Sequence, residues 1–130
     1  MASQKMTLLA RLLVLSDIHA NLPALEAVAA DAKLWEQQHG SITHNICAGD
    51  IIGYGPWPIE ALAFIRENNF ITVRGNHESE TLNLIKEGTC NLSESAGKAA
   101  IYTANLLEES SRYIRMLQIL SNKPIVDYQE

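Results

Sequence analysis

One stretch near the start of the chain decides the fold: Leu12-Leu13-Val14-Leu15-Ser16-Asp17-Ile18-His19-Ala20-Asn21. An apolar run ends here in two side chains that can bind metal, Asp17 and His19, and Asn21 then signals the start of a helix. Side chains at positions i and i+2 of a strand point to the same side. Asp17 and His19 can therefore reach one ion together, although an Asp-x-His pair alone is more often a turn after a buried strand.

The composition fits one globular domain and excludes several other classes of protein. The 130 residues are 47% hydrophobic and 19% charged, which excludes a disordered chain. The net charge is −5 and Lys and Arg form no cluster, so duplex nucleic acid is not an expected partner. No apolar segment approaches the length of a membrane span, so no membrane association is expected either.

The two cysteines do not form the pattern of a disulfide framework. Cys47 lies in an apolar run that is typical of a strand, and Cys90 lies in a polar loop. A reduced protein in the cytoplasm is the simpler interpretation.

Hydrophobic periodicity predicts an α/β fold in which strands and helices alternate. Strands are predicted at about residues 9–16, 45–48 and 70–74, and helices at 22–38 and 59–68. The first strand is apolar almost throughout, which predicts a central parallel strand covered on both faces. Repeated parallel β-α-β units place their ligands outside the carboxyl ends of the strands.

The second half of the chain is predicted to be mainly helical. Helices are expected at about 78–86 and 95–109, and a further helix is expected to start after Ser110 or Ser111. Residues 125–128 resemble the opening of a fourth strand.

Three successive strand ends carry polar residues that could share one site: Asp17 with His19, Asp50, and Asn76 with His77. Carboxylate, imidazole and amide ligands suit divalent Mn, Fe or Zn. With Asp17 and His19 on one ion and Asn76 on a second, Asp50 is placed to bridge both. Two ions about 3.5–4 Å apart hold a hydroxide between them and neutralise charge on a phosphoryl group. His77 could then protonate the leaving-group oxygen or donate a hydrogen bond to phosphate.

The order of three motifs resembles the calcineurin-like metallophosphoesterase superfamily. The motifs are Asp17-x-His19, Gly49-Asp50 and Gly75-Asn76-His77-Glu78. The longer runs at 16–28 and 49–56 look like the small bacterial and archaeal phosphodiesterase branch, and three motifs in the right order are specific evidence.

The resemblance implies a role for each site residue. Asp17 and His19 bind the first metal ion, Asp50 bridges the two ions, Asn76 binds the second ion and His77 is the catalytic histidine. Mn is the expected ion, and Fe, Zn, Ni and Mg are the alternatives. The implied reaction is hydrolysis of a phosphoester, in particular a phosphodiester, in a small molecule or nucleotide.

The resemblance also implies the fold, which is the N-terminal half of a four-layer α/β/β/α sandwich with a mainly parallel sheet flanked by helices. Complete members continue into a second half that carries a further His and a Gly-His-x-His motif. All four histidines of this chain precede residue 78. We therefore expect residues 1–130 to be one metallophosphoesterase domain, truncated at its C-terminus, with impaired activity and an exposed apolar sheet face. A homodimer or a complementing C-terminal segment would cover that face.

The sequence also departs from the family pattern in its second motif. The second motif commonly runs Gly-Asp-x-x-Asp and is often followed by Arg, but Gly53 and Tyr54 stand in those places. In the protein phosphatases the second Asp helps to orient the catalytic histidine, so its absence argues against that branch and leaves His77 without a predicted partner. Glu78 is expected to have a structural role.

Two other functions compete with the enzymatic interpretation. The first is an inactive remnant that acts as a phosphate-binding or protein-interaction module. The second is a nucleotide-binding α/β domain without metal. The second is weaker, because Gly53-x-Gly55 follows an Asp and does not form a Gly-x-Gly-x-x-Gly turn at the start of a helix.

Overall fold

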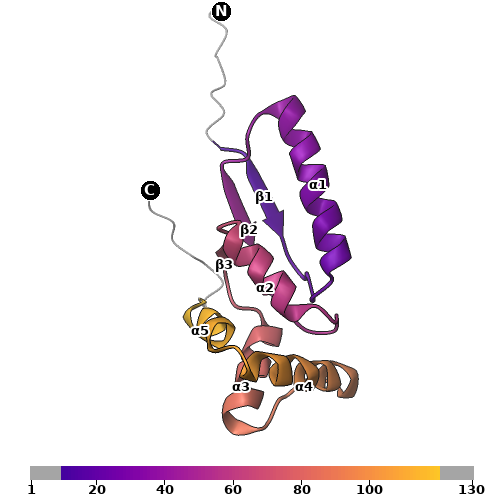
Figure 1. Ribbon diagram of the computed structural model, residues 1–130, viewed down its shortest axis with the longest axis vertical. Coiled ribbons are helices and arrows are strands. Elements are labelled where there is room, and N and C mark those ends of the chain that lie inside the picture. The colour runs from indigo at the N-terminus through magenta and orange to yellow at the C-terminus, as the bar shows by residue number, and fades with distance from the viewer. Residues whose placement is uncertain (1–9, 121–130) are drawn as a thin grey trace, which may run out of the picture.

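The protein is built on a parallel sheet, and the computed structural model describes residues 10–120. The elements are β1 (Leu12–Leu15), α1 (Leu22–His39), β2 (His44–Cys47), α2 (Pro58–Glu67), β3 (Ile71–Thr72), α3 (Asn76–Glu87), α4 (Glu94–Glu108) and α5 (Ser111–Ile119) (Figure 1). The predicted alternation of strands and helices and the helical second half are confirmed. The fourth strand predicted at 125–128 lies outside the described residues.

β1 and β3 are shorter than predicted, and β2 has the predicted length but lies one residue earlier, because the chain turns away from the sheet as soon as the polar motifs begin. The ladder between β1 and β2 ends at the pair Leu15 and Cys47. Asp17 already has a φ of 54°, which no strand residue adopts. β3 keeps only the two pairs that it forms with β2, and α3 starts four residues after it.

The sheet brings the three strand ends to one edge. The strands lie in the order β1-β2-β3 and both pairings are parallel, with Leu12 opposite His44 and Ile46 opposite Ile71. The arrow of β1 points towards the end of the molecule where α3 and α4 lie (Figure 1). The turns after β1, β2 and β3 therefore begin side by side, as parallel sheets require.

One face of the sheet carries α1 and α2. Leu13 of β1 lines the same surface pocket as Ala32 of α1 and Phe64 of α2. On the opposite face, Leu12 is 53% exposed and Val14 is 59% exposed. β1 is also the edge strand of the described sheet, so the prediction of a central strand covered on both faces is wrong for this part of the chain. Exposed apolar side chains on β1 agree with the predicted apolar face, while the truncation from which that face was predicted stays untested.

Caps and core packing fix the helices around the sheet. The side chain of Asn21 accepts a hydrogen bond from the backbone N–H of Ala24 (3.2 Å) at the start of α1, and Gly40 ends that helix, as predicted. The described buried core unites the two halves of the chain: Leu25, Cys47, Ile51, Ile52, Ala61, Leu62, Ile65, Leu107 and Leu117. No helix within residues 10–120 is long and apolar enough to cross a membrane.

Candidate metal centre

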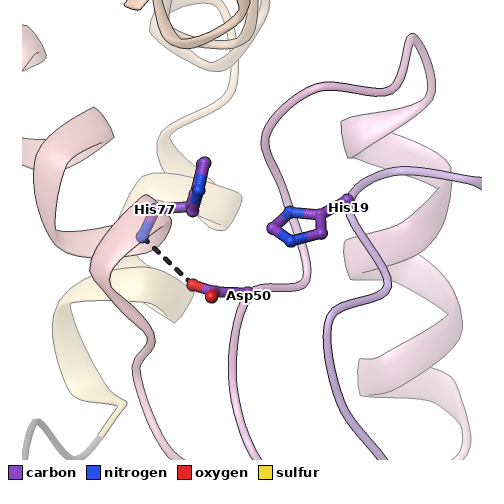
Figure 2. A group of neighbouring side chains, drawn as sticks. All are labelled: His19, Asp50 and His77. Carbon is purple, nitrogen blue, oxygen red and sulfur yellow. Dashed lines mark hydrogen bonds between the residues drawn. The ribbon is translucent and has the colours of Figure 1, made fainter. Parts of the chain in front are cut away.

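Side chains from three successive turns meet at the carboxyl edge of the sheet. His19 follows β1, Asp50 follows β2 and His77 is the second residue of α3. Each offers one ligand atom, and these atoms all lie within 4.8 Å of one another (Figure 2). Segments far apart in the sequence thus bring together atoms that could bind a metal ion, and His77, which was predicted to be catalytic, is one of this group.

Hydrogen bonding fixes which nitrogen of His19 can bind an ion. The Nδ1 atom lies 3.1 Å from the carbonyl oxygen of Ile52, and because a carbonyl can only accept, Nδ1 must carry the proton. The Nε2 atom therefore keeps its lone pair, and it lies 3.5 Å from Oδ1 of Asp17. Ligands that each lie about 2.1 Å from one ion are about 3–3.5 Å apart. Asp17 and His19 thus fit a single ion.

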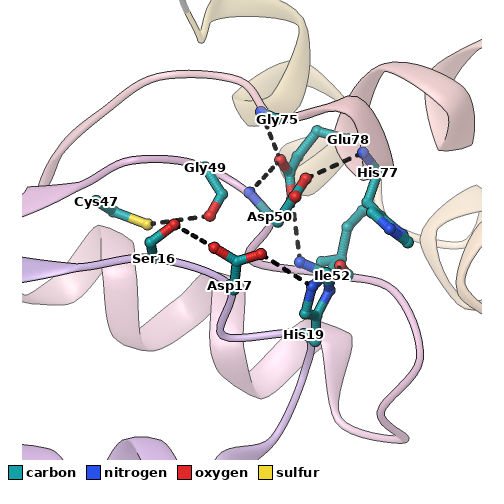
Figure 3. A network of polar contacts seen from close by, with 10 residues as sticks. All are labelled: Ser16, Asp17, His19, Cys47, Gly49, Asp50, Ile52, Gly75, His77 and Glu78. Atoms are coloured by element: carbon teal, nitrogen blue, oxygen red, sulfur yellow. Dashed lines mark hydrogen bonds and ion pairs between the residues drawn. The ribbon is translucent and has the colours of Figure 1, made fainter.

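Asp17 is held in its charged form at the surface. The hydroxyl of Ser16 donates a hydrogen bond to Oδ2 of Asp17 (Figure 3). This bond, and then the nearby His19 ring, lowers the pKa of the Asp17 carboxyl against a smaller opposing effect of desolvation. An ionised carboxylate is the form that binds a cation.

The glycines of two motifs let the turns after β2 and β3 touch. A Cβ atom on Gly49 would lie 2.8 Å from the backbone nitrogen of Gly75, and one on Gly75 would collide with Oδ1 of Asp50. That same oxygen accepts a hydrogen bond from the backbone N–H of His77 (3.1 Å). The close approach therefore aims the Asp50 carboxylate at the start of α3, where His77 lies.

Glu78 has the structural role predicted for it. Its side chain is fully buried, and its two oxygens accept hydrogen bonds from the backbone N–H groups of Asp50 (2.9 Å), Ile52 (3.0 Å) and Gly75 (2.8 Å) (Figure 3). Burial raises the pKa of the Glu78 carboxyl above its usual value, although the three bonds work in the opposite direction. One carboxylate thus joins the turn after β2 to the turn before α3.

His77 is buried and leaves one polar atom unpaired. Its side chain is 6% exposed, and no described residue forms a hydrogen bond with its Nδ1 atom. The backbone of Gly53 lies directly against the ring, so that a Cβ atom there would collide with Nδ1. The aspartate that the wider superfamily often has at this position would not fit His77 as it is placed here. A buried ring nitrogen normally has a partner, and a bound ion or a phosphate oxygen would supply one for Nδ1 of His77.

Asn76 stands at the edge of this group. It is the first residue of α3, it is exposed, and it directly precedes His77. Glu78 fixes the turn before Asn76 through its hydrogen bond from the Gly75 N–H, so the backbone of Asn76 is held in place as a metal ligand would require. The ligand roles of Asp17, His19, Asp50 and Asn76 and the catalytic role of His77 stay predictions.

The sequence did not identify Tyr54 as part of the site. Its ring centre lies 5.0 Å from that of His19 and 4.9 Å from that of His77, and the two histidine rings are 4.7 Å apart. The sequence did hold an indication of this role, since Tyr54 occupies the position where the family pattern often has Arg. The conformation of the loop after β2, which the sequence does not show, brings the Tyr54 ring next to His19 and His77.

Comparison with known proteins identifies the family. Residues 10–129 match the profile of the calcineurin-like phosphoesterases. The chain belongs to this family. Among proteins similar to this phosphoesterase chain is an uncharacterized protein of Methanocaldococcus jannaschii, 34% identical over 113 residues, which cover 87% of the chain and 42% of that protein.

Solved structures support the same fold. A metallophosphoesterase from Sphaerobacter thermophilus matches with a TM-score of 0.67 and 32% identity, over 91% of this chain and 43% of that one. A hypothetical protein from Pyrococcus horikoshii matches with a TM-score of 0.68 and 21% identity, over 83% of this chain and 46% of that one. The predicted metallophosphoesterase fold is confirmed, and the chain spans less than half the length of these relatives. The prediction that residues 1–130 form one truncated domain stays untested.

Proposed function

We propose that this chain binds two divalent metal ions and hydrolyses phosphodiester bonds in small molecules or nucleotides, with reduced activity. The observation that carries the proposal is the convergence of ligand atoms from His19, Asp50 and His77 within 4.8 Å (Figure 2). Membership of the family supports metal-dependent hydrolysis of phosphoesters. Reduced activity is proposed because the further histidines of the family pattern do not occur after residue 77.

Each proposed ligand has a chemical reason. Asp17 and His19 would hold the first ion through Oδ1 and Nε2, Asp50 would bridge, and Asn76 would hold the second ion with a neutral amide that does not cancel its charge. When bound, two such ions attract phosphate and lower the pKa of a bound water. Mn is the proposed metal, and Fe, Zn, Ni and Mg are the alternatives that carboxylate, imidazole and amide ligands can also bind.

His77 is proposed to act on the substrate. Its ring lies beside both His19 and Asp50, and its main chain is held by Oδ1 of Asp50. An imidazole in this place can donate a proton or a hydrogen bond to the oxygen that leaves the phosphorus atom.

The test is hydrolysis of bis(p-nitrophenyl) phosphate by the purified chain with Mn. We expect slow hydrolysis that a chelator stops and that Asp50→Asn reduces by at least about 100-fold, because the bridging charge is lost. Asp31→Asn is the matched control, since Asp31 is exposed on α1. Hydrolysis that survives the chelator, or that is equal in Asp50→Asn and the unmodified chain, would contradict the metal mechanism.

A second function is an inactive module that binds phosphate or another protein. It is favoured by the exposed Leu12 and Val14, which offer apolar surface to a partner. Metal binding without any hydrolysis would support it. For either function we propose a location in the cytoplasm, in keeping with the free thiols of Cys47 and Cys90.

A further inference from the structure

A groove with aromatic walls opens beside the candidate metal centre. It has a volume of about 520 Å³, within the range of small-molecule sites of roughly 300–1,000 Å³. Its lining comes from the turn after β1 and from the loop before α2: Asp17, Ile18, His19, Asn21, Tyr54, Gly55, Pro56 and Trp57. Two of these residues, Asp17 and His19, are also candidate ligands, so the groove and the metal centre share a wall.

The two aromatic side chains of the groove are exposed although they are large. Tyr54 is 56% exposed and Trp57 is 39% exposed, and neither belongs to the described hydrophobic core. The ring of Tyr54 contacts His19 and His77, which places it between the metal centre and the groove. Exposed aromatic surface next to polar groups is typical of a ligand site rather than of packing.

The loop that carries these rings is held rigidly. The N–H groups of Gly55 and Trp57 donate to the carbonyls of His19 (2.9 Å) and Ala20 (3.2 Å). From the other side, the hydroxyl of Tyr102 on α4 donates to the carbonyl of Pro56 (3.0 Å).

Tyr54 itself has a φ of 59°, an uncommon conformation for a residue with a side chain. Strain of this kind persists only where surrounding contacts impose it, and it clusters at functional sites. A rigid loop loses little entropy when a ligand binds.

We propose that the groove binds the planar base of a nucleotide, stacked on Tyr54 and Trp57, while the phosphate lies at the metal centre. The inference rests on the proposed function and narrows its substrate class. Stacking of a base on an aromatic side chain strengthens binding by about 5- to 150-fold. A phosphoester without an aromatic group would leave both rings exposed to water and would bind more weakly.

Binding of AMP and of ribose 5-phosphate, compared by calorimetry with and without Mn, tests the inference. The two ligands share the sugar phosphate and differ in the base. We expect AMP to bind at least about fivefold more tightly, which is the lower end of what one stacked base contributes. Tyr54→Leu should abolish most of the difference and Tyr54→Phe should keep it, because only the aromatic ring matters.

Fluorescence locates the base. The chain has two tryptophans, and Trp35 lies on α1 stacked on His39, outside the groove. In a Trp35→Phe background Trp57 is the only tryptophan, and AMP but not ribose 5-phosphate should quench it.

Equal affinities for the two ligands, or an AMP preference unchanged in Tyr54→Leu, would overturn the inference. Binding is measured apart from turnover, so the two proposals fail separately. A preference for AMP without Mn-dependent hydrolysis overturns only the proposed function. Hydrolysis of bis(p-nitrophenyl) phosphate without a preference for AMP overturns only the base-binding groove.

Discussion

At the scale of single residues, Glu78 shows how a group outside the ligand set organises the site. Its buried carboxylate accepts three backbone hydrogen bonds from two different turns, one of them from Asp50 itself. A buried carboxylate without partners would be strongly destabilising, whereas bonds to a charged group are stronger than neutral ones. The position of the Asp50 side chain therefore depends on Glu78, which lies next to His77 in the sequence.

Replacing Glu78 by glutamine should lower stability by about 1–3 kcal/mol. The amide oxygen can still accept, but the amide NH₂ would face a backbone N–H and leave it unpaired in the interior. Urea unfolding measures the change. Glu60→Gln on the exposed side of α2 is the matched control and should stay within about 0.5 kcal/mol of the unmodified chain. Equal stabilities of the two variants would contradict the structural role.

The two cysteines should react very differently. Burial raises the pKa of the Cys47 thiol to about 11, while Cys90 is only half-buried. At pH 8 a thiol reagent should modify Cys90 readily and Cys47 only after unfolding, because the thiolate is the reactive form. Mass spectrometry after a short exposure identifies the site. Rapid modification of both thiols in the folded chain would show that Cys47 is accessible.

The same shift predicts a dependence of stability on pH. The folded chain keeps the Cys47 proton up to about pH 11, whereas the unfolded chain loses it near the ordinary value of 9.0. The contribution of Cys47 is therefore complete below pH 9 and declines as the pH rises towards 11. Cys47→Ala should be less stable at neutral pH but should lose less further stability over this range.

At the scale of elements, the turns rather than the strands build the site. Positive φ values occur at Asp17, His19, Asp50 and Tyr54, all on the turns after β1 and β2. Backbone hydrogen bonds between those turns, such as His19 N–H to the carbonyl of Asp50 (3.0 Å), hold them in this conformation. The strands deliver the chain to one edge, and pairing of the turns then sets the side-chain directions.

Gly53→Ala should weaken Mn binding more than it weakens the fold. Gly53 has a φ of 94°, and a Cβ atom there would push the His77 ring away. Gly88→Ala is the matched control, because Gly88 also has a positive φ (75°) but no atom lies within 4 Å of its added Cβ. Both variants should lose about 1 kcal/mol of stability from backbone strain.

Only Gly53→Ala should move the His77 ring signals in NMR spectra and reduce the affinity for Mn. The same Mn affinity in the two alanine variants would show that contact between Gly53 and His77 does not matter for the site.

At the scale of the whole molecule, the dominant feature is the apolar surface of β1 that residues 10–120 leave exposed. Leu12 and Val14 are both more than half exposed, and β1 lies at the edge of the described sheet. An apolar sheet face next to an unpaired edge favours association. We propose that a second copy of the chain, or a complementing C-terminal segment, covers this face.

Val14→Lys should reduce self-association and binding of a hydrophobic dye, since a charge would then stand in the middle of the face. Leu34→Lys on α1 is a close control, because Leu34 and Val14 are both 59% exposed. Analytical ultracentrifugation should show a larger species for the unmodified chain and for Leu34→Lys, and a monomer for Val14→Lys. A monomer that binds no dye in all three would rule out this interface.

Local sequence patterns correctly predicted where most of the helices begin and end. The N-cap residues Asn21 and Ser110 lie where the sequence predicts helix starts, and α1 and α3 end at His39 and Glu87, one residue beyond their predicted ends, because capping and helix termination depend on neighbouring residues. The strand ends were predicted less well, since Asp17 leaves the ladder through contacts with the turn at Gly49, which is distant in sequence.

By itself, the sequence determined that residues able to bind a metal ion follow three parallel strands, because motif spacing and strand periodicity are properties of consecutive residues. Tertiary structure decided the rest: Glu78 holds Asp50, Gly53 packs on His77, Tyr54 reaches two histidines, and residues 10–120 leave Leu12 and Val14 of β1 exposed. Each of these depends on which distant segments meet. The local sequence shows how apolar a strand is, but it does not show whether other segments of the protein pack against that strand.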